Sequence, residues 1–188
     1  QYRDVAAWVD SLTKILSFPS VALLPGHFQP VLGEETIHET LTNYRDAIES
    51  VLIQTLECVN HGKSEDETVR SVALPEQLRD LPYLGECYGT IQWSIRSIYH
   101  GYLGWFDGNP TNLNRVSEET YAKEILGLIS DPKIVLDRIE RLQADGEDQL
   151  ACELCDVLIH AGVDQMKAKQ LKAKSLMVMA KQQTSSNG

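Results

Sequence analysis

The sequence predicts a mainly all-α fold, a bundle of stacked helical hairpins similar to tetratricopeptide repeats. Apolar residues recur every three or four positions through most of the 188 residues, which is the spacing of one helix face. Short breaks rich in glycine, proline and aspartate separate these segments, so consecutive helices are expected to pair. No repeat motif is spelled out, and the hairpin architecture is inferred from the pairing alone.

Residues 4–17 are expected to form an amphipathic helix, because its apolar residues share one face: Val5, Trp8, Val9, Leu12, Ile15 and Leu16. The short apolar run 21–24 precedes Pro25-Gly26 and predicts a buried strand that ends in a tight turn. One strand cannot make a sheet, since its amides would stay unpaired. Residues 1–33 are therefore expected to be the edge of a larger αβ domain, and the chain a fragment.

A long helix is predicted over residues 34–60, ended by His61-Gly62. Ser64 and Glu67 have the spacing of a capping box, which predicts a helix to about residue 72. A connector then leads to a third helix over residues 86–102. Residues 34–181 are thus expected to form one helical domain.

Four further helices are predicted over 117–129, 132–144, 147–160 and 164–181. Asp131 precedes a proline at the first helical position, and Asp164 precedes the last helix, so both are expected to cap. The last helix carries five lysines, which indicate a solvated face rather than a lipid or acidic-partner site. Residues 182–188 have nothing to bury and are expected to be a disordered tail.

The segment ECYGTIQWSIRSIYHGYLGWFDGNP, residues 86–110, sets many aromatic residues among glycines. It resembles the dimerisation domain of alkyl sulfatases of the metallo-β-lactamase superfamily, in which an aromatic helix runs into a similar turn. The resemblance implies that residues 1–33 are a helix-strand remnant of the αββα hydrolase domain and that residues 34–181 are the dimerisation domain. It also implies a homodimer, and a small sulfate ester as the substrate of the full-length enzyme. We expect the helices over 34–60 and 86–102 to form the dimer interface, because a self-complementary apolar patch closes a two-fold assembly.

His27 is the candidate metal ligand, because it follows the predicted strand and a Pro-Gly turn, where side chains often face an active site. Position alone favours a loop histidine bonded to a carbonyl over a metal ligand. The resemblance implies that it binds the second metal of a site with two zinc ions. A catalytic zinc needs about three protein ligands, and the superfamily's clustered His-x-His-x-Asp-His motif is missing here. No zinc is therefore expected on this chain alone.

Tyr88 is the candidate catalytic residue, as an active-site neighbour. The resemblance places it where related sulfatases often have a histidine that approaches the sulfate group. A phenol can donate a hydrogen bond to an anionic oxygen, but with an unperturbed pKa of about 10 it is a poor proton shuttle near neutral pH. This departure leaves another ester open as the substrate. Tyr88 also fits a packed core position.

Two other motifs are interpreted as structural. Cys152 and Cys155 form a Cys-x-x-Cys on one helix face, without a second pair to complete a metal site, so small core residues are expected. Glycines at 104 and 108 follow a helix, whereas a phosphate-binding loop precedes one. The segment 104–110 is therefore expected to be a turn that Trp105 and Phe106 anchor against the helices.

The composition of the chain argues against several classes of function. The 17 basic and 27 acidic residues give a net charge of −10, which repels a phosphate backbone and argues against a nucleic-acid partner. No apolar run reaches the roughly 20 residues of a membrane span. Four unevenly spaced cysteines do not indicate a disulfide scaffold. The compartment, periplasm or cytoplasm of a bacterium, stays open.

Three functions are consistent with these observations. The first is a fragment of a zinc-dependent alkyl sulfatase-like hydrolase, inactive alone and mainly responsible for homodimerisation. The second is a non-catalytic helical module that binds a peptide or protein in a concave groove. The third is a hydrolase of the same superfamily that acts on another ester.

Overall fold

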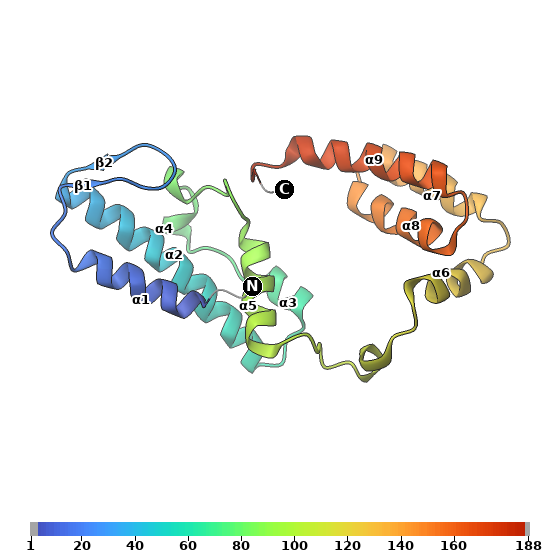
Figure 1. Ribbon diagram of the computed structural model, residues 1–188, viewed down its shortest axis with the longest axis horizontal. Coiled ribbons are helices and arrows are strands. Elements are labelled where there is room, and N and C mark those ends of the chain that lie inside the picture. The colour runs from blue at the N-terminus through green and yellow to red at the C-terminus, as the bar shows by residue number, and fades with distance from the viewer. Residues whose placement is uncertain (1–3, 187–188) are drawn as a thin grey trace. The chain divides into compact units, whose positions relative to one another are not determined.

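The computed structural model describes residues 4–186 and is mainly helical, as predicted (Figure 1). Its α-helices are α1 (Val5–Leu16), α2 (Glu34–Asn60), α3 (Glu65–Ser71), α4 (Glu76–Arg79), α5 (Ile91–Leu103), α6 (Glu118–Gly127), α7 (Lys133–Ala144), α8 (Asp148–Ala161) and α9 (Gln165–Gln182). Two 3₁₀ helices, η1 (Pro82–Leu84) and η2 (Pro110–Asn114), and two strands complete the described chain. Its contacts form two compact units, residues 4–109 with 185–186, and residues 110–184.

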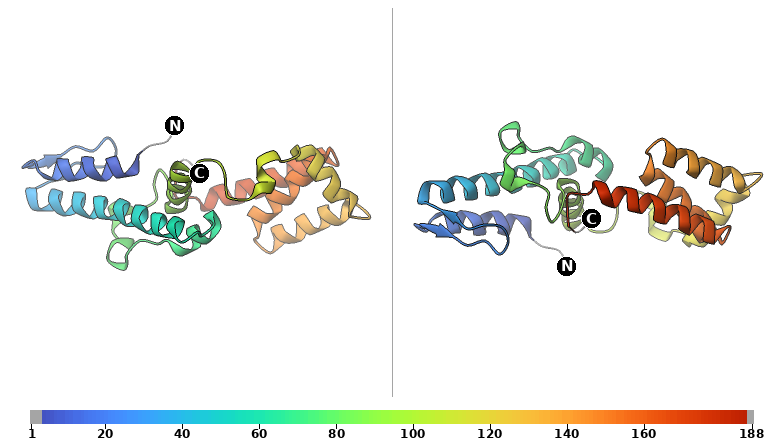
Figure 2. Two further views of the ribbon diagram at one scale, coloured as in Figure 1. Left: turned by 90° about the horizontal axis from the view of Figure 1, so that it is seen from below. Right: turned by 90° about the horizontal axis from the view of Figure 1, so that it is seen from above.

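In the first unit α1 and α2 lie side by side and run in opposite directions, joined by a β-hairpin (Figures 1 and 2). Helices α3 and α5 pack against α2. The core between them is aliphatic, and Ile95 and Ile98 of α5 are buried against Val51 and Leu52 of α2. Burial of these side chains fixes α5 on α2.

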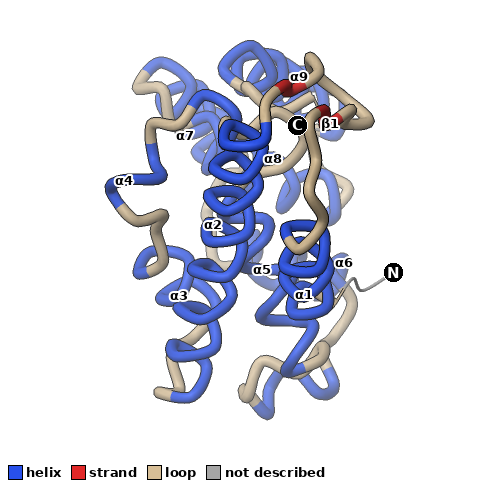
Figure 3. Tube along the Cα trace, turned by 90° about the vertical axis from the view of Figure 1, so that its left-hand side faces the viewer, coloured by secondary structure: helices blue, strands red, loops and turns tan. Residues whose placement is uncertain are grey.

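The hairpin corrects the prediction of a single buried strand. Strand β1 (Ala22–Leu23) pairs antiparallel with β2 (Val31–Leu32), and the two strands are the short red stretches in Figure 3. Gly33 closes the hairpin by donating to the carbonyl of Val21 over 3.0 Å, with a φ of 94° that suits glycine. The amides are thus paired locally, whereas Val21 and Leu24 remain 78% and 77% exposed.

The start of α5 also differs from the prediction. The helix starts at Ile91 rather than at residue 86. Two side chains end the preceding loop: Thr90 Oγ1 accepts a hydrogen bond from the amide of Trp93 over 3.1 Å, and Glu86 accepts one from the amide of Ile91 over 2.7 Å. Both satisfy donors that have no partner inside the helix. Tyr88 therefore lies in the loop before the helix.

In the second unit α8 packs against α6, α7 and α9, which confirms the predicted pairing of neighbouring helices. Its core includes Ile139 of α7 and Leu158 of α8, both fully buried. Asp131 caps α7 as predicted, since its carboxylate accepts from the amide of Lys133 over 2.9 Å. The cap predicted for Asp164 is wrong: its backbone is left-handed, with φ 44°, and its side chain caps nothing. A side-chain cap normally acts from extended backbone.

The glycine-rich turn after α5 is structural, as expected. Gly104 and Gly108 have φ of 77° and 84°, and Asp107 accepts a hydrogen bond from the amide of Asn109 over 3.0 Å. The predicted anchoring role of the aromatic pair is wrong for Trp105, which is 72% exposed and meets Phe106 edge to face. Polar turn bonds hold this segment without help from the indole.

Across residues 4–186, none of the helices combines the length and apolar character needed to traverse a bilayer. The domain boundary predicted at residue 33 and the loose tail predicted for 182–188 stay predictions. Residues 187 and 188 of that tail lie outside the described chain.

Candidate functional site

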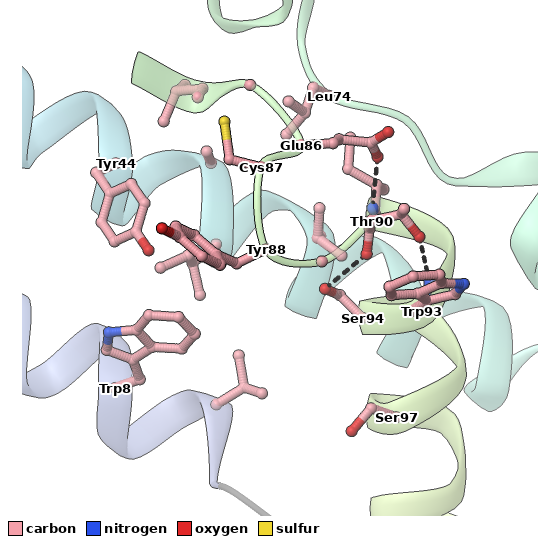
Figure 4. Close-up of a pocket in the computed structure, with 18 of the residues that line it drawn as sticks. Trp8, Tyr44, Leu74, Glu86, Cys87, Tyr88, Thr90, Trp93, Ser94 and Ser97 are labelled. Carbon is pink, nitrogen blue, oxygen red and sulfur yellow. Dashed lines mark hydrogen bonds between the residues drawn. The ribbon is translucent and has the colours of Figure 1, made fainter. Parts of the chain in front are cut away.

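The first unit contains a half-open cavity of about 640 Å³ between α1, α2 and α5 (Figure 4). Trp8 enters from α1 and Tyr44 from α2, and the two rings meet edge to face at a centroid distance of 6.0 Å. Trp93 lines the cavity from α5, and Tyr88 extends into it from the loop before that helix. Ala47, Ile48 and Val51 of α2 add an aliphatic part of the wall.

The cavity walls are largely uncharged. Among the described lining residues Glu86 is the one acidic residue, and no Lys, Arg or His lines the cavity; the Glu86 carboxylate accepts a hydrogen bond from the amide at the start of α5. Burial raises the pKa of Tyr44, so its phenol is neutral at ordinary pH. Polar groups gather on the α5 side, where Ser94 and Ser97 line the cavity. An apolar cavity with few polar groups is typical of a small-molecule site.

Tyr88, which lines the cavity, contacts His27, the other residue singled out by the sequence analysis. Their positions are 61 residues apart in the chain, yet the phenol oxygen of Tyr88 lies 3.4 Å from Nδ1 of His27. The two rings lie against one another at a centroid distance of 4.7 Å and an interplanar angle of 35°. Since 3.4 Å is long for a hydrogen bond, ring contact contributes more to the pair than the hydroxyl.

Phe28 follows His27 at the hairpin tip with φ of 69°, a left-handed conformation that is strained for a bulky side chain. Tyr88 also contacts Phe28, edge to face at 6.1 Å between centroids. One tyrosine from the loop before α5 thus touches both residues of the tip. These contacts offset part of the strain and hold the imidazole at the edge of the cavity.

The donor set fits a metal ion only in part. His27 is exposed, and an imidazole is a common zinc ligand. Within residues 4–186, however, no three His, Cys, Asp or Glu side chains gather closely enough to hold a metal ion. His27 can supply one ligand, and further ligands would have to come from outside this chain.

A charged cluster in the first unit holds α5 on α3. Glu65 accepts from Arg96 Nη1 over 2.5 Å and lies 3.1 Å from His100 Nε2. The hydrogen bond to Glu65 raises the pKa of Arg96 above its ordinary value. Tyr99, which is buried, donates its hydroxyl to the carbonyl of Lys63 over 3.1 Å. The sequence analysis assigned none of these residues, although Arg96 and His100 share one helix face.

The Cys-x-x-Cys pair does not form a reactive site. Cys152 and Cys155 are buried in the core of the second unit, as predicted. Burial raises the pKa of the Cys155 thiol to about 11, so the reactive thiolate is scarce near neutral pH. The pair is therefore a packing feature.

Comparison with known proteins gives consistent relatives. A linear primary-alkylsulfatase of a Pseudomonas species is 38% identical over 93% of this chain. An alkyl/aryl-sulfatase of Saccharomyces cerevisiae is 27% identical over 94% of it. The chain spans only 33% and 28% of the lengths of these two relatives. This chain therefore corresponds to about a third of the length of these relatives.

The fold has a close counterpart among solved structures. The stereoselective inverting sec-alkylsulfatase Pisa1 from a Pseudomonas species superposes with a TM-score of 0.91 and 26% identity, over 97% of this chain and 30% of the other. The sequence profile described as alkyl sulfatase dimerisation matches residues 64–188, more than half of the chain. This chain therefore belongs to the alkyl sulfatase dimerisation family.

Proposed function

We propose that this chain acts within a metal-dependent sulfate ester hydrolase, in which it completes the active-site edge and mediates homodimerisation. The observation that carries the proposal is the contact between His27 and Tyr88 at an aromatic cavity. In this function His27 supplies one ligand to a two-zinc site, and Tyr88 lies beside it, facing the substrate. Bound zinc would polarise the ester and activate water.

Exposed apolar side chains of residues 4–33 support a larger hydrolase domain. Phe18, Val21, Leu24 and Leu32 are 59%, 78%, 77% and 68% exposed. Soluble proteins rarely leave so many large apolar side chains in one short segment open to water. Further polypeptide that covers the hairpin would remove these apolar side chains from water. It could also bring the missing metal ligands to His27.

A complementation experiment tests the active-site role. The chain is expressed with the hydrolase domain of a related Pseudomonas alkylsulfatase from which the corresponding segment has been removed. We expect zinc binding and dodecyl sulfate hydrolysis to be restored by the wild-type chain and not by His27→Ala. His38→Ala removes an exposed imidazole on α2 and serves as the control. Equal zinc content for both variants would refute the ligand role, and turnover by the chain alone would refute the need for further ligands.

The dimerisation role has support from the family and from α5. Tyr102 and Leu103 are 48% and 45% exposed at the end of α5, whereas Ile53, at 49%, is the one exposed large apolar side chain of α2. Such residues suit a two-fold interface, because one self-complementary patch closes the assembly. The proposed interface therefore relies more on α5 than on α2.

Sedimentation at tens of micromolar tests this role. We expect a dimer that Leu103→Glu dissociates, because an unpaired carboxylate would be buried. Leu150→Glu, at a similarly exposed leucine of α8, is the control and should remain dimeric. A strict monomer for the wild-type chain contradicts dimerisation. Dissociation by Leu150→Glu alone refutes the choice of α5.

A further inference from the structure

We propose that Ser186 positions Tyr88 by holding the backbone of the loop before α5. The contact that carries this inference joins residues 99 positions apart in the chain. The amide and the hydroxyl of Ser186 both donate to the carbonyl oxygen of Cys87, over 2.8 and 3.0 Å. The inference deepens the function proposed above and rests on it for the role of Tyr88 beside the substrate. Because Ser186 acts through the loop backbone, it is a positioning residue and not a catalytic one.

The bonded carbonyl is directly linked to Tyr88. The carbonyl of Cys87 and the nitrogen of Tyr88 belong to one peptide group, and the two residues are neighbours in the loop (Figure 4). A peptide group is planar, so a fixed oxygen also fixes the plane that leads to the Cα of Tyr88. A carbonyl oxygen has two lone pairs, which can accept both donors of Ser186. The two bonds therefore restrict the direction in which the Tyr88 side chain leaves the loop.

The loop gains from a bond to a segment outside it. Gly85 and Gly89 flank residues 86–88, and glycine gives the backbone more conformational freedom than any other residue. The amide of Cys87 donates to the carbonyl of Gly85 over 2.8 Å, but this bond lies within the loop. It shapes the turn without fixing it to the rest of the first unit. The bonds from Ser186 connect the turn to a segment far away in sequence.

The segment that supplies these donors is itself packed. Ser185 is only 4% exposed, and residues 185–186 form part of the first unit although they follow α9 in the chain. A neighbour that is already ordered reduces the conformational entropy lost when Ser186 bonds to Cys87. The chain after α9 thus contributes to the loop that contains the candidate catalytic residue.

A graded set of variants tests the contact. Ser186→Ala removes the hydroxyl donor, Ser186→Pro removes the hydroxyl and the amide hydrogen, and Ser186→Thr retains both donors. Ser11→Ala is the matched control, because it removes an exposed serine hydroxyl that donates to the carbonyl of Ala7 within α1 over 2.7 Å. Circular dichroism checks that each variant folds. If Ser186→Pro does not fold, the comparison of Ser186→Ala with Ser186→Thr decides the question.

Nuclear Overhauser contacts in the chain alone measure the position of Tyr88 without any hydrolysis. In the wild type we expect contacts from the ring of Tyr88 to the rings of His27 and Phe28. They should weaken in Ser186→Ala, disappear in Ser186→Pro, and persist in Ser186→Thr and Ser11→Ala. Contacts of wild-type strength in both Ser186→Ala and Ser186→Pro would overturn the proposal.

The complemented enzyme described above shows whether Ser186 acts through Tyr88. We expect Ser186→Pro to lower kcat about tenfold at unchanged zinc content, because a displaced group loses the benefit of a fixed geometry. In a Tyr88→Phe background the same substitution should have little further effect, since the hydroxyl whose position it controls is already absent. An equal loss in both backgrounds would show that Ser186 does not act through Tyr88.

The two experiments distinguish failure of this inference from failure of the proposed function. If the Overhauser contacts respond as expected but the complemented wild type hydrolyses no sulfate ester, Ser186 positions Tyr88 and the sulfatase function fails. If complementation succeeds while Ser186→Pro changes neither the contacts nor kcat, the function stands and the role of Ser186 is refuted.

Discussion

The contact between His27 and Tyr88 makes a quantitative prediction through a double-mutant cycle. A partly exposed aromatic pair at 4.7 Å contributes about 0.5–1.5 kcal/mol. We expect the effects of His27→Ala and Tyr88→Ala on the free energy of unfolding to be non-additive by about 0.5–1 kcal/mol. Tyr88→Phe keeps the ring and removes a hydroxyl 3.4 Å from Nδ1, so it should cost less than about 0.5 kcal/mol.

Urea denaturation followed by tryptophan fluorescence is the assay. All three tryptophans of the sequence, Trp8, Trp93 and Trp105, lie in the first unit, so the signal reports the unit that contains the pair. The ring protons of His27 should also lose an upfield ring-current shift in Tyr88→Ala and retain it in Tyr88→Phe. His61→Ala with Tyr88→Ala is the control cycle and should be additive. Additivity for His27 and Tyr88, with unmoved ring protons, would refute the contact.

Two predictions concern stability alone. Ser64→Ala removes the capping box of α3, in which Ser64 and Glu67 bond reciprocally, and should lower the free energy of unfolding by about 1 kcal/mol; an unchanged urea midpoint would contradict it. Burial raises the pKa of Cys155 from about 9 to about 11, so the unfolded chain loses the thiol proton first. The stability from this residue should be complete below pH 9 and decline towards pH 11, and Cys155→Ala should remove that decline; rapid labelling of native Cys155 by a thiol reagent at pH 8 would contradict it.

The helical framework could be predicted because its signals are local. The bounds of α2 agree with the prediction, since a long amphipathic pattern is flanked by Gly33 and by His61-Gly62. Capping signals are also local, and the side chains of Ser64 and Asp131 form the predicted hydrogen bonds at the starts of α3 and α7. Each of these features depends on residues within a few positions of one another. No tertiary information is needed to find them.

The hairpin and the cavity depend on distant residues, and the prediction missed them. The partner of β1 is a two-residue strand, too short to produce an alternating pattern. The spacing places Trp8 on the apolar face of the first helix, and Tyr44 lies within the predicted long helix, yet only the packing of α1 on α2 brings their rings together at the cavity. The sequence contains the residue types of the site, but it does not show that they come together in space.

The late start of α5 shows how local capping determines the site. A helix from residue 86, as predicted, would place Tyr88 within its first turn, where the side chain points along the helix surface. Glu86 and Thr90 instead bond to the amides of Ile91 and Trp93, which keeps residues 86–90 outside the helix. Loop backbone in this segment lets Tyr88 reach the hairpin tip at His27 and Phe28. These two hydrogen bonds thus keep Tyr88 in the loop before α5, where it can contact the candidate metal ligand His27.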